Sequence, residues 1–297
     1  MIDQHILQSV LGITTSSTKQ YQQLALSNIQ TPNSLSFFDD PRYLDELNAN
    51  QHITGVFVEE NNAERINPEK EIFIVDDPRW HYFTLYNFIA KQNKVSFKSQ
   101  IHPSSQIHPT SYIAESNVII GKNCIIYPNV TILEDVELGD NCIIQSGTVL
   151  GGEGFEYKRT KKGILPVYHD GKLIVGNDVH FGLNNTIDKG YQYRHTIIGD
   201  DCKLDNQVHI AHCVQVGKRV LFPASCMLAG SITIGDDVWI GPNSSISSGV
   251  TIGNRAFITI GAVVTKNVED DQRVTGNFAI PHSLFMKGLK KTMEGNE

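Results

Sequence analysis

Residues 198–264 read IGDDCKLDNQVHIAHCVQVGKRVLFPASCMLAGSITIGDDVWIGPNSSISSGVTIGNRAFITIGAVV. An aliphatic or aromatic residue recurs at every sixth position of this stretch. These twelve anchors are Ile198, Leu204, Ile210, Val216, Phe222, Leu228, Ile234, Ile240, Ile246, Ile252, Ile258 and Val264. A period of six fits neither the 3.6 residues of a helical turn nor the two-residue alternation of a strand, but it is the period of hexapeptide β-helices. The stretch therefore predicts a solenoid with three hexads, eighteen residues, in each coil.

The same period begins much earlier in the chain. It runs from Ile101 to Leu150 with one seven-residue step, and it returns at Val175, Phe181 and Ile187. Two stretches interrupt it, near 151–174 and 189–196, and we expect loops there. Loops on a rigid scaffold are where binding and catalytic residues are usually found.

The periodicity divides the chain into three parts. Residues 1–98 alternate strand-like runs, such as ITGVFVEE, with the helical pattern PRWHYFTLYNFIAKQ, and they predict a small α/β domain. Residues 99–268 predict the β-helix domain, and residues 269–297 predict a C-terminal extension with a short helix. The expected fold class is mainly β, with a parallel β-helix preceded by an α/β domain.

Composition limits the possible partners and location. The net charge of −7 and the pI near 5.9 argue against nucleic acid, which requires a basic face. No apolar run approaches the length of a transmembrane helix and the N-terminus lacks a signal-peptide pattern, so we expect a cytoplasmic protein without a transmembrane segment. Four of the five cysteines fall at the inward step of a hexad, which favours packing over disulfides or metal binding.

One column of residues spaced by eighteen contains residue types that could carry out catalysis. It contains His212, Gly230, Ser248 and Lys266. In a coil, residues eighteen apart stack about 4.8 Å from one another. Glycine leaves space beside the imidazole, and its N–H could face the same space. A neutral histidine is the usual general base for an amine or hydroxyl, and a backbone N–H is a common oxyanion donor, although a lone histidine in a repeat is more often a polar corner residue.

Several stretches together resemble a known family. They are SFFDDPRYLDEL, QSGTVLGGEGFEY, NNTIDKG, KLDNQVHIAH and MLAGS. In this combination the chain, from about 35 to 281, resembles the UDP-3-O-acylglucosamine N-acyltransferases of lipid A biosynthesis, which are hexapeptide-repeat acyltransferases. The resemblance implies a left-handed β-helix, a homotrimer and active sites between subunits.

The resemblance also implies roles for individual residues. His212 corresponds to the catalytic base and Gly230 to the oxyanion donor, while Asp205 would orient His212 or bind the sugar. Phe37 and Tyr43 match the aromatic pair that holds uracil in a uridine-binding first domain. The remaining candidate substrate-binding residues, from matching motifs, the loop and the column, are Asp40, Asn206, Phe155, Tyr157 and Ser248.

Three departures separate this chain from the family pattern. The family's second histidine, in a Gly-His pair, is replaced in Ser247-Ser248-Gly249, and the asparagine that reads uracil is Asp40. Glu153 and Glu156 stand at the acidic position and the second glycine of the family loop, and the C-terminal helical segment is short. These departures indicate a diverged relative, and they favour the alternative of a different nucleotide-linked amino sugar, acylated from a coenzyme A thioester.

The implied function is transfer of an acyl group from a thioester to the amine of a nucleotide-activated amino sugar, as in UDP-3-O-acylglucosamine N-acylation. The donor would be a 3-hydroxyacyl group on the phosphopantetheine arm of acyl carrier protein, with no permanently bound cofactor and no metal. The alternative is an N-acyltransferase that uses acetyl-CoA or a short acyl-CoA on a UDP- or dTDP-linked amino sugar of O-antigen or surface polysaccharide. A hexapeptide metalloenzyme of the carbonic anhydrase kind would need His180, His209 and His212 to converge between subunits, and a non-catalytic scaffold is the remaining alternative.

Overall fold

A computed structural model describes residues 1–276 and 281–294. They form two compact units: residues 1–97 with 154–171 and 190–194, and residues 98–153 with 172–189 and 195–297. Both stretches that interrupt the hexads thus contribute residues to the first unit, although the sequence pattern assigns them to the β-helix domain. Residues 277–280 and 295–297 of the expected C-terminal extension lie outside the described part.

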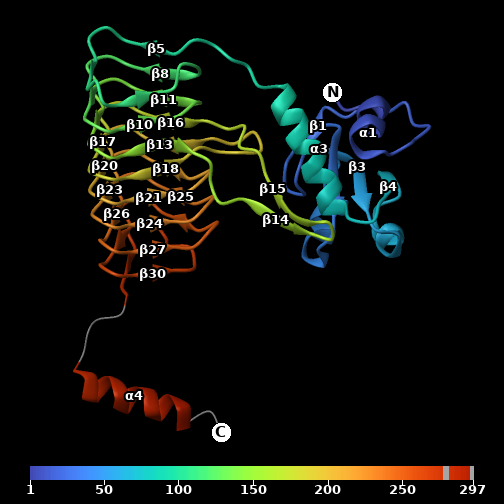
Figure 1. The fold of residues 1–297 in the computed structure, drawn as a ribbon. Coiled ribbons are helices and arrows are strands. Elements are labelled where there is room, and N and C mark those ends of the chain that lie inside the picture. The colour runs from blue at the N-terminus through green and yellow to red at the C-terminus, as the bar shows by residue number, and fades with distance from the viewer. Residues whose placement is uncertain (277–280, 295–297) are drawn as a thin grey trace. The chain divides into compact units, whose positions relative to one another are not determined.

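The first unit contains a four-stranded parallel sheet in the order β1-β2-β3-β4 (Figure 1). Its strands are β1 (Gln23–Leu24), β2 (Ser34–Phe38), β3 (Ile53–Val58) and β4 (Glu71–Ile74). Its helices are α1 (Gln4–Leu11), η1 (Pro41–Tyr43), α2 (Leu44–Ala49), η2 (Glu60–Arg65) and α3 (Pro78–Gln92). The expected strands and the helix PRWHYFTLYNFIAKQ are confirmed.

Helix α3 organises the first unit because it is capped and buries an aromatic face. The Asp77 carboxylate accepts a hydrogen bond from the Trp80 N–H, and Pro78 occupies the first turn, where its missing N–H costs nothing. Tyr82, Phe83 and Tyr86 are buried. The stretch after Gly154 forms an antiparallel hairpin, β14 (Tyr157–Thr160) and β15 (Gly163–Pro166).

The second unit is a left-handed parallel β-helix with three faces, each a stack of short strands (Figure 1). The β21 face consists of β7 (Tyr112–Ile113), β10 (Thr131–Ile132), β13 (Val149–Gly152), β18 (Thr186–Asp188), β21 (His209–Ile210), β24 (Met227–Leu228), β27 (Ser245–Ile246) and β30 (Val263–Val264). The β19 face consists of β5 (Gln100–Ile101), β8 (Val118–Ile120), β11 (Val136–Leu138), β16 (Leu173–Val175), β19 (Thr196–Ile198), β22 (Gln215–Val216), β25 (Thr233–Ile234) and β28 (Thr251–Ile252). The β20 face consists of β6 (Gln106–Ile107), β9 (Ile125–Ile126), β12 (Ile143–Ile144), β17 (His180–Phe181), β20 (Lys203–Leu204), β23 (Leu221–Phe222), β26 (Trp239–Ile240), β29 (Phe257–Ile258) and β31 (Arg273–Val274).

The expected register of eighteen residues is confirmed where the hexads are unbroken. His209 pairs with Met227, Met227 with Ser245, and Ser245 with Val263. All twelve anchors are buried, together with the cysteines at the inward steps. The five cysteines are free thiols.

Two further features concern helices. The C-terminal helix α4 (His282–Glu294) is present, as expected. Across residues 1–276 and 281–294, none of the helices combines the length and the apolar character that a membrane span requires.

Candidate active site

A cavity of about 430 Å³ lies in the first unit at the carboxyl end of strand β2. Residues 36–40 follow or end this strand, and α2 with η1 continues the wall. Phe37 and Tyr43 both line the cavity, so the structure brings together the two aromatics expected to hold a base. Phe37 packs on Tyr82 and Phe83, with ring centroids 4.7 and 5.8 Å away, whereas Tyr43 is 50% exposed.

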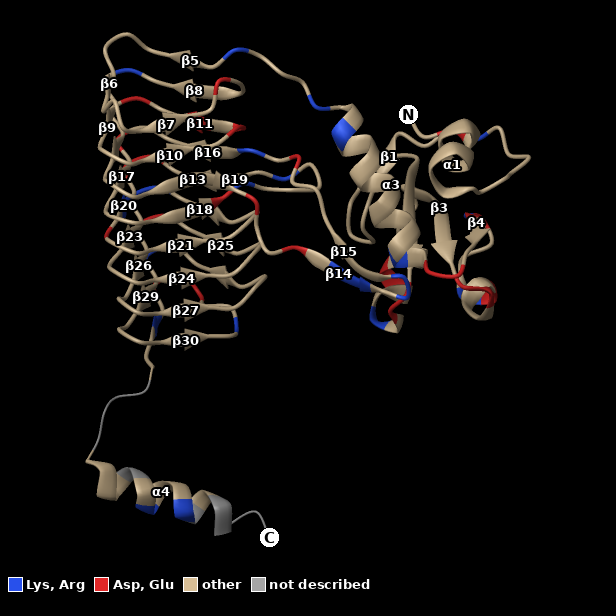
Figure 2. Ribbon diagram, in the orientation of Figure 1, with Lys and Arg blue, Asp and Glu red and all other residues tan. Residues whose placement is uncertain are grey.

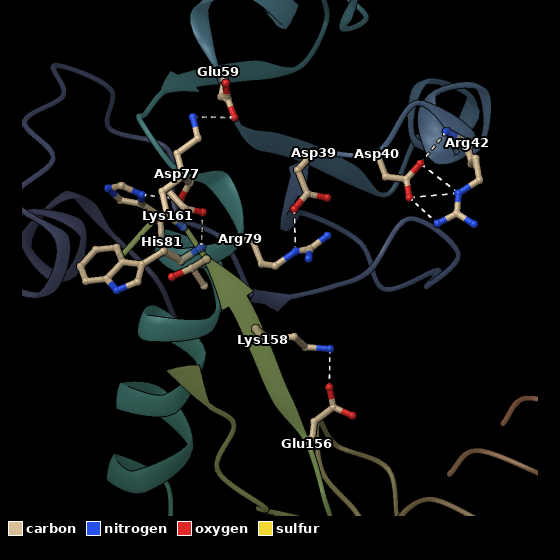
Figure 3. A network of polar contacts seen from close by, with 12 residues as sticks. Asp39, Asp40, Arg42, Glu59, Asp77, Arg79, His81, Glu156, Lys158 and Lys161 are labelled. Atoms are coloured by element: carbon tan, nitrogen blue, oxygen red, sulfur yellow. Dashed lines mark hydrogen bonds and ion pairs between the residues drawn. The ribbon is translucent and has the colours of Figure 1, made fainter. Parts of the chain in front are cut away.

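Ion pairs fill the polar side of this cavity (Figure 3). The Arg42 guanidinium binds both carboxylate oxygens of Asp40, with Nη2 2.6 Å from Oδ2. The side-chain hydrogen bond from Arg42 is the main reason that the pKa of Asp40 falls to about 2. Asp40 is therefore an ionised acceptor at any physiological pH.

Arg79 and Asp39 form a second pair, with Nε 2.7 Å from Oδ2. Burial raises the pKa of the Asp39 carboxyl, and the nearby Arg79 only partly opposes this effect. Lys158 supplies a third cation to the cavity and pairs with Glu156. The sequence pattern did not identify Arg79, Lys158 or Gln192, because they come from α3, from the hairpin and from the second interruption.

Phe155 and Tyr157 lie next to each other in the first unit, with ring centroids 5.0 Å apart. They are 88% and 50% exposed. Neither is among the residues that line the cavity, whereas the next residue along β14, Lys158, is. Neighbouring side chains on a strand face opposite sides, which explains why the cation and not the aromatic lines the cavity.

The second candidate site is the His212 column of the β-helix. The pairing of β21, β24, β27 and β30 brings His212, Gly230, Ser248 and Lys266 into one column. A Cβ built on Gly230 would lie 2.2 Å from His212 Cε1, and 2.8 Å from both ring nitrogens. The imidazole thus lies directly against the Gly230 backbone, and only glycine leaves it that space.

The Gly230 N–H is a buried donor in this column. Its neighbours Ala229 and Ser231 donate to Ile246 O and His212 O. The Gly230 N–H itself donates no hydrogen bond to any residue that the structure describes. Ser248 is exposed beyond it, and Gly249 takes the left-handed conformation with φ of 73°.

His209 and Asp188, which were not among the expected site residues, lie on the same face of the β-helix as His212. His209 is on β21, three residues before His212, and Asp188 ends β18, the strand that pairs with β21. His209 Nδ1 is 2.8 Å from Thr186 Oγ1, and its Nε2 is 3.9 Å from Asp188 Oδ2. Burial raises the pKa of Asp188, and the charge of His209 opposes this rise. The matching motif NNTIDKG was the available signal for Asp188.

Asp205 and Asn206 occupy an exposed corner after β20. The Asn206 side-chain oxygen accepts a hydrogen bond from Leu183 N, and its backbone carbonyl accepts one from Ser225 N. Within the described residues Asp205 makes no hydrogen bond to His212. The structure places Asn206 as a link between coils of a single chain.

The histidines proposed for a metal site lie on two faces. His180 is on β17 of the β20 face, whereas His209 is on β21 and His212 follows it. In residues 1–276 and 281–294 there is no group of three His, Cys, Asp or Glu side chains arranged to hold a metal ion.

Comparison with known proteins relates the β-helix to one family. The profile of the bacterial transferase hexapeptide family (six repeats) matches residues 117–152, 195–230 and 231–266. The second match contains both His212 and Gly230.

Individual relatives point the same way. The chain is 40% identical over 153 residues to a UDP-3-O-acylglucosamine N-acyltransferase of Bordetella pertussis, a match that covers 50% of this chain and 41% of that protein. It is 31% identical over 166 residues to a probable UDP-3-O-acylglucosamine N-acyltransferase 2, mitochondrial, of Arabidopsis thaliana, covering 56% of this chain and 54% of the other. The chain thus spans about half the length of the curated relatives it matches.

A solved UDP-N-acetylglucosamine acyltransferase from Campylobacter jejuni superimposes with a TM-score of 0.50 at 21% identity, over 60% of this chain and 72% of that one. At this identity the likeness concerns the fold alone. The β-helix carries the hexapeptide repeats of the bacterial transferases, and the chain resembles the UDP-3-O-acylglucosamine N-acyltransferases.

Proposed function

We propose that this protein is an N-acyltransferase that acylates the amine of a nucleotide-activated amino sugar. The observation that carries the proposal is the contact of the His212 imidazole with the Gly230 backbone inside a matched hexapeptide segment. A base and an oxyanion donor side by side are what acyl transfer to an amine requires. The names of the relatives, UDP-3-O-acylglucosamine N-acyltransferases, agree with this chemistry.

The reaction follows from these two groups. The sugar amine attacks the thioester carbonyl while His212 removes a proton from the nitrogen. The Gly230 N–H donates a hydrogen bond to the oxyanion of the tetrahedral intermediate. When the intermediate collapses, the C–S bond breaks and the thiolate takes the proton from the His212 imidazolium, so an amide and a thiol leave the site.

The first-unit cavity is the proposed nucleotide site. Phe37 and Tyr43 offer aromatic faces to the base, and Asp40 lies at the same wall. The acyl donor is proposed to be a 3-hydroxyacyl group on acyl carrier protein, and the protein a homotrimer that works in the cytoplasm. These assignments extend the resemblance and need no permanently bound cofactor.

One observation favours a second substrate. Asp40 is held ionised by Arg42, whereas the resemblance expects an asparagine that reads uracil. An ionised carboxylate only accepts hydrogen bonds, whereas an amide both donates and accepts them. An acetyl-CoA or short acyl-CoA enzyme that acts on another UDP- or dTDP-linked amino sugar is therefore the alternative.

The test is an acylation assay with product identification by mass spectrometry. UDP-3-O-acylglucosamine and a panel of UDP- and dTDP-amino sugars are each mixed with 3-hydroxyacyl carrier protein or acetyl-CoA. Acylation of UDP-3-O-acylglucosamine by the carrier protein supports the main proposal, and acylation of another amino sugar from CoA alone supports the alternative.

His212→Ala tests the mechanism in the same assay. Loss of a general base should lower turnover by roughly two or more orders of magnitude while the circular dichroism spectrum stays unchanged. A folded His212→Ala protein with normal turnover would refute the base assignment, and a scaffold without catalysis predicts no acylation by the wild type.

A further inference from the structure

The β14–β15 hairpin is fastened to the N-terminus of helix α3 through its tip (Figure 3). The Lys161 backbone N–H donates a 2.5 Å hydrogen bond to Asp77 Oδ2. The Lys161 ammonium lies 3.1 Å from Glu59 Oε1. These contacts join residues that are 84 and 102 positions apart in the chain, so they fix the path of the hairpin.

Asp77 divides its two oxygens between two elements. Oδ1 accepts a hydrogen bond from the Trp80 N–H and caps α3, while Oδ2 accepts one from the Lys161 N–H of the hairpin. The residue is 4% exposed, and a carboxylate buried this far requires such partners. One side chain therefore starts the helix and anchors the hairpin.

Other contacts hold the hairpin along the same helix. The Lys162 ammonium lies 3.9 Å from the centre of the Trp80 ring and 3.4 Å from Asp76 Oδ2. At the other end of the hairpin, the Asn87 side chain donates to Pro166 O and accepts from Tyr168 N, both at 2.8 Å. Helix α3 thus supports both ends of the hairpin. Figure 2 shows the basic and acidic residues that gather near the tip of the hairpin.

Lys158 lies on the first strand of this supported hairpin and lines the cavity. Its ammonium is 4.7 Å from the centre of the Phe83 ring and pairs with Glu156. The side chain is 24% exposed. An ammonium has three N–H donors, so Lys158 can bind Glu156 and still donate to an anion in the cavity.

We infer that Lys158 binds a phosphate group of the cavity's ligand and that Asp77 is the positioning residue that holds the hairpin, and with it Lys158, in place. The inference rests on the proposed nucleotide site, since it assigns the charged part of that ligand. It adds to the aromatic wall a cation from a separate element.

The test compares UDP, uridine and inorganic pyrophosphate by isothermal titration calorimetry on four full-length variants. Asp77→Asn keeps a good helix cap but has only one acceptor oxygen, so it loses one of the two hydrogen bonds. Lys158→Met removes the cation and keeps the apolar stem. Asp3→Asn is the matched control, because Asp3 also caps a helix, α1, through Ile6 N, and among the described residues its carboxylate holds no second element. Glu156→Gln removes the carboxylate that competes for Lys158.

Lys158→Met should weaken binding of UDP and pyrophosphate by roughly tenfold and leave uridine within about twofold, as expected for loss of a charge-assisted hydrogen bond. Asp77→Asn should weaken UDP by roughly threefold to tenfold with the same sparing of uridine, and speed hydrogen exchange at the Lys161 amide. Glu156→Gln should tighten UDP. Asp3→Asn should match the wild type with all three ligands.

Three outcomes would overturn the inference. They are wild-type UDP affinity in Lys158→Met or Asp77→Asn, an equal loss for uridine and UDP, and absence of binding of all three ligands to the wild type. The first two leave the proposed nucleotide site standing, and only the third removes both. Pyrophosphate binding that depends on Lys158, without uridine binding, would support the inference and refute only the base-stacking role of Phe37 and Tyr43.

Discussion

Gly230 admits the His212 imidazole because it has no side chain. A methyl group there would sit 2.2 Å from Cε1, far inside van der Waals contact, and the ring is buried and cannot simply swing into solvent. The backbone conformation at Gly230 is not left-handed, so a substitution tests space and not backbone strain.

We predict that Gly230→Ala lowers turnover by at least about tenfold, because it displaces the general base from its position beside the oxyanion donor. The measurement is kcat in the acylation assay, with the melting temperature as the check on folding. Gly288→Ala is the matched control, since a Cβ there meets nothing within 4 Å. Unchanged turnover in a folded Gly230→Ala protein would contradict the proposed arrangement.

Asp188 should make stability depend on pH. Burial raises its pKa, so between the unfolded and folded pKa values the folded chain binds more protons than the unfolded chain. The free energy of unfolding therefore falls as pH rises through that window. Asp188→Asn cannot titrate, so it should melt above the wild type at pH 7, and the difference should close as pH falls below about 4, where the carboxyl is protonated in both states. A difference in melting temperature that is constant from pH 4 to pH 8 would refute this prediction.

The β-helix is built from corners as much as from strands. Corner residues repeatedly adopt the left-handed conformation, among them Asn129, Asp135, Asn141 and Asn243. Asparagine and aspartate tolerate this conformation better than other residues with a side chain, and β-branched residues tolerate it worst. The hexad thus has two requirements, an inward anchor and a corner residue that accepts positive φ.

We predict that Asn243→Val lowers the free energy of unfolding by about 1–2 kcal/mol, because valine must adopt φ of 57°. Thr251→Val introduces the same side chain on the exposed side of β28, a strand of the β19 face, where a β-branched residue is favourable, and it should be neutral or slightly stabilising. Urea denaturation of both variants measures the difference. Equal effects at the two positions would show that corner conformation does not limit stability.

The sequence predicted the elements whose pattern is local or strictly periodic. The six-residue spacing gave the anchors and the register of the β21 face, and the proline and apolar spacing gave helix α3. It could not predict which residues line the first-unit cavity, because Arg79, Lys158 and Gln192 come from three distant segments. In this loop the sequence pattern predicted a binding role for the aromatic residues Phe155 and Tyr157, whereas strand alternation brings Lys158 to the cavity. The expected roles of the site residues stay predictions.

At the scale of the whole molecule, the β-helix faces differ on their outer sides. On the β21 face the outward residues Tyr112, Met227 and Val263 are 56%, 50% and 73% exposed. On the β19 face the equivalent outward positions include the polar residues Gln215 and Thr233, and on the β20 face the outward Leu221 and Phe257 are less exposed, at 39% and 36%. Exposed apolar side chains that recur along one face are typical of a protein interface, and the proposed occupant is another copy of this chain in the homotrimer.

We predict that Met227→Glu dissociates the proposed homotrimer, because it places a charge where apolar side chains of neighbouring copies would meet and leaves that charge without a partner. Light scattering after size exclusion should report about three times 33.1 kDa for the wild type and a single chain for the variant. Thr233→Glu, at an exposed position of the β19 face, is the control and should remain trimeric. If active sites form between subunits, as the resemblance implies, Met227→Glu should also lose acylation while the monomer keeps its circular dichroism spectrum. A Met227→Glu protein that remained trimeric would exclude this face as the interface, and an active monomer would show that one chain holds a complete site.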